Sequence, residues 1–172
     1  MSSDDPEGVE ATPQELKAMA HPLRLRILRL CLHEPRTNKE IADRLGKDPA
    51  TTLHHIRLLV RTGFLEAQEV RTGARGALEK PYLATRKSWT MRVSRPEDKE
   101  EGMTAMLDAL RDEMIDAGPH ATVEGARIGV KLSPRRAKAF ERRIRKLIAD
   151  LAAEDEDPDG DEYGFFAVFH RR

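Results

Sequence analysis

The sequence predicts an α+β protein that is mainly helical, with a small amount of β-structure. Residues 13–62 contain four stretches whose apolar residues recur at helical spacing between capping residues. Residues 64–85 then contain two short alternating stretches on either side of a glycine-containing segment, which is typical of a hairpin. Further helical periodicity beyond residue 90 indicates a second region.

Three short helices are expected first, over residues 13–21, 22–35 and 37–46. The second begins at Pro22, a residue suited to a first helical turn, and Pro35 is expected to end it. Its core-facing stripe consists of Leu23, Ile27, Leu28 and Cys31. In the third, Thr37 and Glu40 form a capping box, and Gly46 is expected to end the helix.

A fourth helix is expected over residues 48–62. Asp48 is a good N-cap, Pro49 suits the first helical position, and Gly63 suits a left-handed C-terminal residue. At 100° per residue the apolar side chains gather on one side, and small, polar and basic ones gather on the other. Because the short third helix precedes it across "GKD", the pair predicts a helix-turn-helix. Leu58 points outward and is interpreted as packing beneath the following hairpin.

The segment after Gly63 changes to strand periodicity. "FLEAQEV" and "PYLAT" alternate, and "RTGARGALEK" between them holds two glycines and three basic residues. A basic hairpin directly after a helix-turn-helix predicts a winged helix-turn-helix, with the wing over residues 65–84.

Charge is distributed unevenly along a chain whose net charge is zero. Residues 13–87 contain 15 Lys/Arg and 8 Asp/Glu, whereas residues 1–12 and 88–172 have an excess of acids. This pattern favours an anionic partner for the middle block, and double-stranded DNA fits it. The single cysteine permits no internal disulfide, and no apolar run is long enough for a membrane span, so a cytoplasmic protein is expected.

The chain is expected to divide into three parts. Residues 1–12 are predicted to be a disordered acidic tail, residues 13–90 the winged helix-turn-helix domain, and residues 91–172 a C-terminal dimerisation or effector region. In the last part we expect a helix over residues 97–117 and a β-α-β unit, with strands near 126–132 and 163–169 around a long helix that starts after Ser133. The basic run "RRAKAFERRIRK" on that helix is interpreted as a solvated face, with a second phosphate-binding surface as the alternative.

These motifs resemble the winged helix-turn-helix of ArsR-type bacterial transcriptional regulators. The resemblance covers roughly residues 14–87, and its strongest elements are "HPLRLRIL" and "LHHIRLL…GFL". It implies a homodimer that binds operator DNA, usually as a repressor, with many members of the family releasing DNA when they bind a metal. The dimer would form through the helix over residues 97–117. The apolar residues expected in the interface are Met103, Met106, Leu107, Leu110 and Met114. The alternative for this stripe is the wall of a pocket for an unknown small-molecule effector.

The chain lacks the metal ligands best known in that family. "EPRTNKEIA" has no Cys-x-Cys pair, and the helix over residues 97–117 has acids but no histidine. Adjacent His54 and His55 diverge by about 100° on a helix, so they do not converge on a metal. The acidic loop "EDEDPDGDE" has the early acids of a calcium-binding loop. At the position where such a loop needs a bidentate Glu, this sequence has Phe166. We therefore predict no metal and no cofactor.

The outward face of the fourth helix is predicted to enter the major groove, while the wing contacts the backbone or the minor groove. The residues expected to bind DNA are Ala50, Thr51, Thr52, His54, His55, Arg57, Arg61, Arg71, Arg75 and Lys80. Arginines 57 and 61 suit phosphates, whereas the small residues at the helix start allow close approach to base edges.

The sequence contains no catalytic constellation, because the histidine pair has no nearby nucleophile or supporting acid. Cys31 lies on an apolar stripe and is interpreted as a buried structural thiol. We therefore predict a DNA-binding regulator and not an enzyme. The alternative is a protein-interaction module that uses the winged helix to dock another protein.

Overall fold

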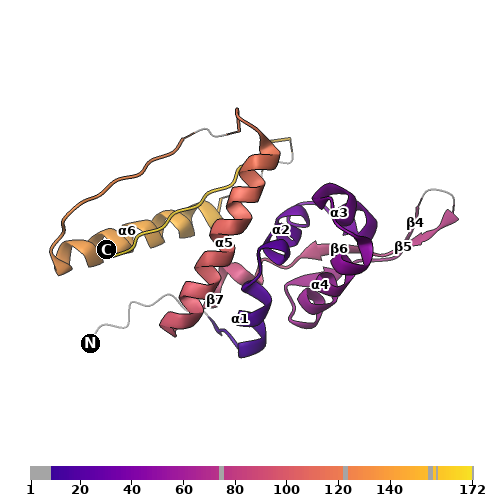
Figure 1. Ribbon diagram of the computed structural model, residues 1–172, viewed down its shortest axis with the longest axis horizontal. Helices are drawn as coiled ribbons and strands as arrows, with labels where there is room; N and C mark the ends of the chain where they lie inside the picture. Colours follow the sequence, from indigo (N-terminus) through magenta and orange to yellow (C-terminus); the bar gives the residue numbers. More distant parts are fainter. Residues whose placement is uncertain (1–8, 74–75, 122–123, 155–156, 158, 172) are drawn as a thin grey trace. The chain divides into compact units, whose positions relative to one another are not determined.

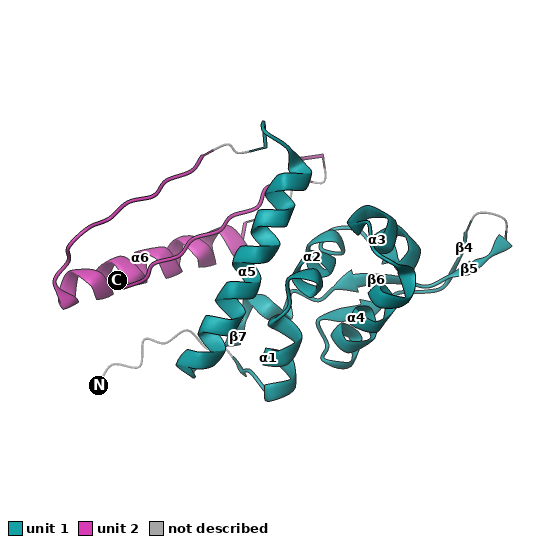
Figure 2. Ribbon diagram, viewed as in Figure 1, with its two compact units in different colours: residues 1–123 teal, residues 124–172 magenta. Residues whose placement is uncertain are grey.

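The computed structural model describes residues 9–73, 76–121, 124–154, 157 and 159–171. The chain forms two compact units, residues 1–123 and residues 124–172, which Figure 2 distinguishes by colour. The first unit contains the helix-turn-helix and the wing, as predicted.

Four helices begin the first unit, and local sequence accounts for each of them (Figure 1). They are α1 (Pro13–Met19), α2 (Pro22–Leu30), α3 (Asn38–Leu45) and α4 (Pro49–Arg61). The predicted capping box of Thr37 and Glu40 is present at α3, and Gly46 ends that helix at a φ of 60°. Gly63, just beyond α4, has a φ of 75°, so the predicted left-handed turn is also confirmed.

Helix α2 ends earlier than predicted. Its last residue is Leu30, and Pro35 does not serve as its terminator. The reason lies in the partners of its final carbonyls: the Arg36 Nε donates to the carbonyl of Leu30 at 2.8 Å, and the Ala84 amide donates to that of Cys31 at 2.8 Å. These partners replace the bonds that another helical turn would have supplied.

A small antiparallel sheet follows the helices, and a hairpin extends from it. The strands β2 (Arg36–Thr37), β6 (Pro81–Ala84) and β3 (Leu65–Ala67) pair in the order β2-β6-β3. The strands β4 (Arg71–Thr72) and β5 (Leu78–Glu79) pair antiparallel, with Arg71 opposite Glu79. In Figure 1 this hairpin extends away from the helices, as expected of a wing.

The core of the first unit lies between the helices and the sheet. Its buried side chains come from α1 to α4 and from the start of β3: Ala18, Ile27, Cys31, Ile41, Leu45, Ile56, Leu59, Phe64 and Leu65. Burying this apolar surface is the main favourable contribution to folding. The predicted stripe of α2 is confirmed, since Ile27 and Cys31 are fully buried and Leu23 and Leu28 pack against the same cluster.

Helix α5 (Pro96–Ala117) belongs to the first unit, whereas the sequence placed it with the C-terminal region. It packs on α1 and α2 through the buried Ala105 and Ala109. Arg26 of α2 forms ion pairs with Asp112, at 3.7 Å, and with Asp116. Because these contacts tie α5 to α2, the first unit extends beyond the predicted boundary at residue 90.

The predicted disordered tail also needs a correction over its last four residues. Val9–Glu10 forms β1, which pairs in parallel with β7 (Met91–Arg92), and Thr12 caps α1. This pairing joins the two ends of the winged helix. The remainder of the predicted tail, residues 1–8, lies outside the described residues.

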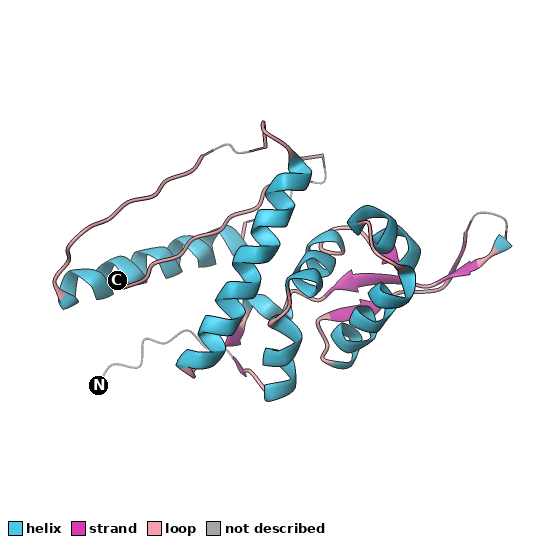
Figure 3. Ribbon diagram, in the orientation of Figure 1, coloured by secondary structure: helices cyan, strands magenta, loops and turns pink. Residues whose placement is uncertain are grey.

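The second unit consists of helix α6 (Pro134–Ala152) and the segments that flank it. Ser133 caps α6 as expected, accepting a hydrogen bond from the amide of Arg136. The predicted β-α-β unit is wrong for the described residues, because 124–132 and 163–171 form no strand and are drawn as loop in Figure 3. Alternation alone does not make a strand, since a strand also needs a hydrogen-bonded partner.

Candidate nucleic-acid interface

Helix α4 is held firmly on one side and free on the other. Asp48 caps its start by accepting hydrogen bonds from the amides of Ala50 at 2.8 Å and Thr51 at 3.3 Å. Ile56 and Leu59 are fully buried against the core. The short α3 precedes α4 across a tight turn, and the two helices pack together as a helix-turn-helix.

The opposite face of α4 is exposed and carries most of the residues predicted to bind DNA. These are Ala50, Thr51, His54, Arg57 and Arg61. At 100° per residue, Ala50, His54, Arg57 and Arg61 share one line along the helix. Neither Arg57 nor Arg61 has an ion-pair partner among the described residues, so both guanidinium groups are available to phosphates.

Thr52 does not belong to this face. Its side chain is fully buried, and its hydroxyl donates to the carbonyl of Asp48 at 3.0 Å. A small β-branched residue two positions after Ala50 faces the core, because two helical steps rotate it by about 200°. The prediction that Thr52 contacts DNA is therefore wrong.

His55 is half-buried and differs from its exposed neighbour His54. The centroids of the His55 and His21 rings are 4.6 Å apart. The Nδ1 of His55 is 3.4 Å from a terminal nitrogen of the Arg24 guanidinium. Burial, and then the positive neighbours His21 and Arg24, lower the pKa of His55 to about 4. The imidazole is therefore neutral near pH 7.

The last turn of α4 is also tied down. The Lys87 ammonium donates to the carbonyl of Thr62 at 2.7 Å and pairs with Glu15 of α1. The hydrogen bond from Lys87 holds the pKa of Glu15 at about 2, well below its usual value. A cation at a helix C-terminus also interacts favourably with the helix dipole.

The wing presents fewer free cations than the sequence suggested. Arg71 is paired with Glu40 at 2.8 Å and with Glu79 at 3.3 Å, so a phosphate would compete with two carboxylates. Lys80 is exposed, whereas Arg75 lies outside the described residues. Leu58, expected beneath the wing, packs instead against the core cluster.

The predicted apolar stripe of α5 is largely exposed. Met106, Leu107 and Met114 are exposed by 39%, 49% and 49%, while Met103 and Leu110 are half-buried. The stripe is distinct from the Ala105 and Ala109 face that contacts α2. The first unit therefore carries an apolar surface beside its helix-turn-helix.

The remaining candidates are the single cysteine, a metal site and a membrane-spanning helix. Burial raises the pKa of the Cys31 thiol to about 12, as expected of a structural cysteine. Among the described residues, no cluster of three His, Cys, Asp or Glu side chains could hold a metal ion. No helix in the described ranges is long and apolar enough to cross a membrane.

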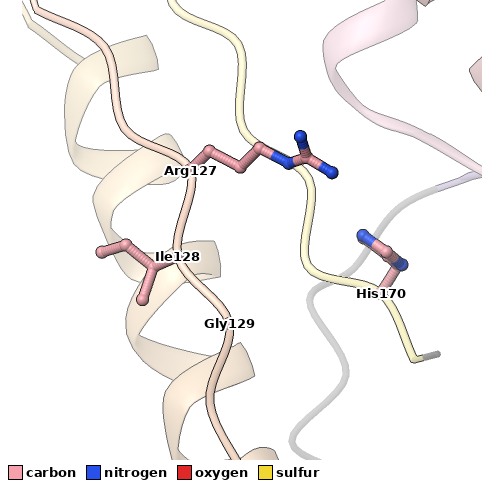
Figure 4. Close-up of a pocket in the computed structure, with 4 residues that line it drawn as sticks. All are labelled: Arg127, Ile128, Gly129 and His170. Carbon is pink, nitrogen blue, oxygen red and sulfur yellow. The ribbon is translucent and has the colours of Figure 1, made fainter.

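The second unit contains an open cavity of about 530 Å³, lined by Arg127, Ile128, Gly129 and His170. Figure 4 shows the Arg127 and His170 side chains extending toward the same space, while Ile128 extends to the other side of the chain. The cavity is therefore polar on the side that Arg127 and His170 share.

Arg24 is the functional candidate that sequence reasoning missed. It is only 8% exposed and contacts both α1 and α4. A helical wheel could have found it, because Arg24 falls between Ile27 and Leu28 on the apolar stripe of α2. An arginine inside such a stripe needs buried acceptors, and the structure supplies them.

Residues 19–68 match a family model described as a helix-turn-helix domain. No curated protein sequence matches the chain. Among solved structures, the chain is similar to NolR from Sinorhizobium fredii, at 19% identity over 58% of this chain and 80% of that one, with a TM-score of 0.36.

Two further solved structures are similar at a comparable level. One is a possible transcriptional regulator for arsenical resistance, with 17% identity over 64% of this chain and 100% of that one and a TM-score of 0.35. The other is a mutant of MepR from a multidrug-resistant S. aureus clinical isolate, with 16% identity over 78% of each chain and a TM-score of 0.31.

The chain therefore has an α+β winged helix-turn-helix fold. The matched helix-turn-helix domain supports a role in DNA binding and in the regulation of transcription.

Proposed function

We propose that the protein is an ArsR-type regulator that binds operator DNA in a sequence-specific manner, as a homodimer in the cytoplasm. Helix α4 would enter the major groove, and the wing would lie along the backbone or the minor groove. The observation that carries this proposal is the exposed line of Ala50, His54, Arg57 and Arg61 on a helix whose other side is fixed in the core.

The residues of this line divide by chemistry into two groups. Ala50, Thr51 and His54 lie in the first half of α4, where a recognition helix meets base edges. Arg57 and Arg61 lie further along and suit phosphates, which set register without reading sequence. Lys80 of the wing would add a further phosphate contact, and Arg71 would add one only after leaving Glu40 and Glu79.

The homodimer would form through the exposed apolar stripe of α5. A two-fold dimer places two copies of α4 in successive major grooves, about 34–36 Å apart. Repression is the mode of regulation that a dimer covering an operator favours. An effector would act by changing the distance between the two recognition helices, and the second unit is our candidate region for it.

The proposal is tested by the salt dependence of DNA binding. A duplex selected by the protein from a random pool would be titrated by fluorescence anisotropy across a salt series. We predict that Arg57→Gln and Arg61→Gln each lower affinity and reduce the log–log salt slope by about one unit, because each removes one phosphate contact.

Lys131→Gln provides the matched control, because it removes a positive charge from an exposed position in the second unit, outside the winged helix and α5. It should leave the slope unchanged. If all three variants reduced the slope equally, binding would depend on overall charge and the proposed interface would be wrong. If the wild-type protein bound no DNA even at low salt, the winged helix would instead dock a protein.

A further inference from the structure

A buried arginine connects three elements behind the recognition helix. Arg24 of α2 donates from Nε to the carbonyl of Ala18 at 2.5 Å and from a terminal nitrogen to that of Lys17, also at 2.5 Å. Both carbonyls belong to the last turn of α1, where helix carbonyls lack partners of their own. The second terminal nitrogen of Arg24 faces the Nδ1 of His55 on α4.

The neighbouring histidine completes this arrangement. His21 caps α2, and its Nδ1 accepts a hydrogen bond from the Leu23 amide at 3.2 Å. Its ring is tilted against that of His55, with the centroids 4.6 Å apart. His55 therefore contacts α2 through both a polar and a ring contact, although it lies on the helix that would read DNA.

The donors and acceptors in this cluster are matched. An arginine has no acceptor, so the facing Nδ1 of His55 accepts and the ring proton resides on Nε2. A protonated His55 would place a second positive charge beside Arg24. Within the described part of the chain, the groups that face His55 are His21, Arg24 and His54, and none of them is a carboxylate. The neutral imidazole of His55 is therefore the form that matches the Arg24 donor.

We propose that Arg24 and His55 form a positioning pair for the recognition helix, so that His54 and not His55 contacts a base. Arg24 is anchored to the end of α1, and its contact with His55 fixes the first half of α4 relative to α1 and α2. This inference rests on the proposed DNA-binding function and assigns different roles to two adjacent histidines.

Substitutions at His55 test this directly. In His55→Asn the amide oxygen takes the place of Nδ1 as an acceptor for Arg24, whereas His55→Phe keeps an aromatic ring without an acceptor. Asparagine and phenylalanine have similar helix propensities, so this difference is not confounded by helix stability. We expect His55→Asn to bind the selected duplex like the wild type and His55→Phe to bind it about tenfold or more weakly, the size of one mismatched base pair.

A readout without DNA separates this inference from the proposed function. Amide hydrogen exchange over residues 50–55 should be faster in His55→Phe than in the wild type, and unchanged in His55→Asn. His54→Phe is the matched control: it should weaken binding to the selected duplex without changing exchange. If the wild type failed to bind DNA, the proposed function would be wrong, and exchange would still show whether the pair holds α4.

The opposing results are equally clear. If His55→Asn lost as much affinity as His55→Phe, the imidazole itself would contact DNA and the positioning role would be overturned. Equal exchange in both variants would overturn it as well. Because removing Arg24 entirely can unfold the protein, Arg24→Lys is used in a double-mutant cycle, and His55→Phe should add little to its effect.

Discussion

The imidazole of His55 has an environment that favours its neutral form, and this links the stability of the first unit to pH. In the unfolded chain a histidine takes up a proton near pH 6.5, whereas in the folded protein burial, His21 and Arg24 lower the pKa of His55 to about 4. Between these values the unfolded state binds more protons, so acid favours unfolding.

We therefore predict that stability is highest above pH 6.5 and falls as the pH decreases toward 4. Because His55 is partly exposed to solvent, its contribution is on the order of 1 kcal/mol. Urea unfolding at pH 7 and pH 5 would measure the loss, and His55→Asn should lose less than the wild type. Glu15 does not interfere, since its pKa of about 2 places its effect below about pH 4.5.

Equal losses in the wild type and in His55→Asn would contradict this assignment. Burial raises the pKa of Glu113 on α5, which shifts stability in the opposite direction over acidic pH. That contribution is common to both proteins. The lowered pKa of His21, whose ring contacts that of His55, shifts stability in the same direction as His55, so the difference between the two proteins measures His55 together with this contact.

At the scale of single elements, the start of α4 depends on one capping residue. Asp48 accepts from two amides of the first turn, and its carboxylate lies at the positive end of the helix dipole. We predict that Asp48→Ala lowers the free energy of unfolding by about 1 kcal/mol. Thermal unfolding would detect this as a lower midpoint.

Asp43→Ala is the control for that variant. The side chain of Asp43 on α3 is exposed and, among the described residues, forms an ion pair with Lys39 at 2.5 Å, so its loss should cost at most about 0.5 kcal/mol. If both variants had the same effect, loss of a surface charge and not of the cap would explain the result.

The elements of the first unit could be predicted because their boundaries are coded locally. Thr37, Glu40 and Gly46 mark α3, and Asp48, Pro49 and Gly63 mark α4, each through backbone chemistry within a few residues. In the second unit, the alternating segments contain no local signal that specifies a partner strand. Their pattern therefore predicted strands that the described residues do not form.

The candidate site was predicted where it depends on helix geometry and missed where it depends on tertiary contacts. The exposed line of α4 follows from the 100° step, and the same step places Thr52 on the buried side, about 200° from Ala50. The partners of Arg71 could not be read from the sequence, since they depend on how the wing packs against α3. Likewise, only the fold brings Arg24 to His55.

On the scale of the whole molecule, the exposed stripe of α5 predicts association. Single exposed apolar residues are ordinary, but Met106, Leu107 and Met114 lie on one face. We predict that the wild type has twice the chain mass of 19.5 kDa in light scattering, and that Leu107→Glu with Met114→Glu yields the monomer.

The position of the introduced charge decides this test. Glu101 is exposed on the side of α5 opposite the stripe, so Glu101→Lys should leave the dimer intact. A wild type that remains monomeric at micromolar concentration would contradict the two-fold model. Dissociation by Glu101→Lys as well would show that a change of charge alone, and not loss of the stripe, separates the subunits.

The most direct test of the central claim is the ratio of affinities for two duplexes of equal length and composition. One carries the sequence selected from a random pool, and the other is its scrambled version, both measured by anisotropy at the same salt concentration. A sequence-reading regulator should prefer the selected duplex by about 10³-fold or more, with a steep salt dependence. Equal binding to both duplexes would contradict the claim that α4 reads bases.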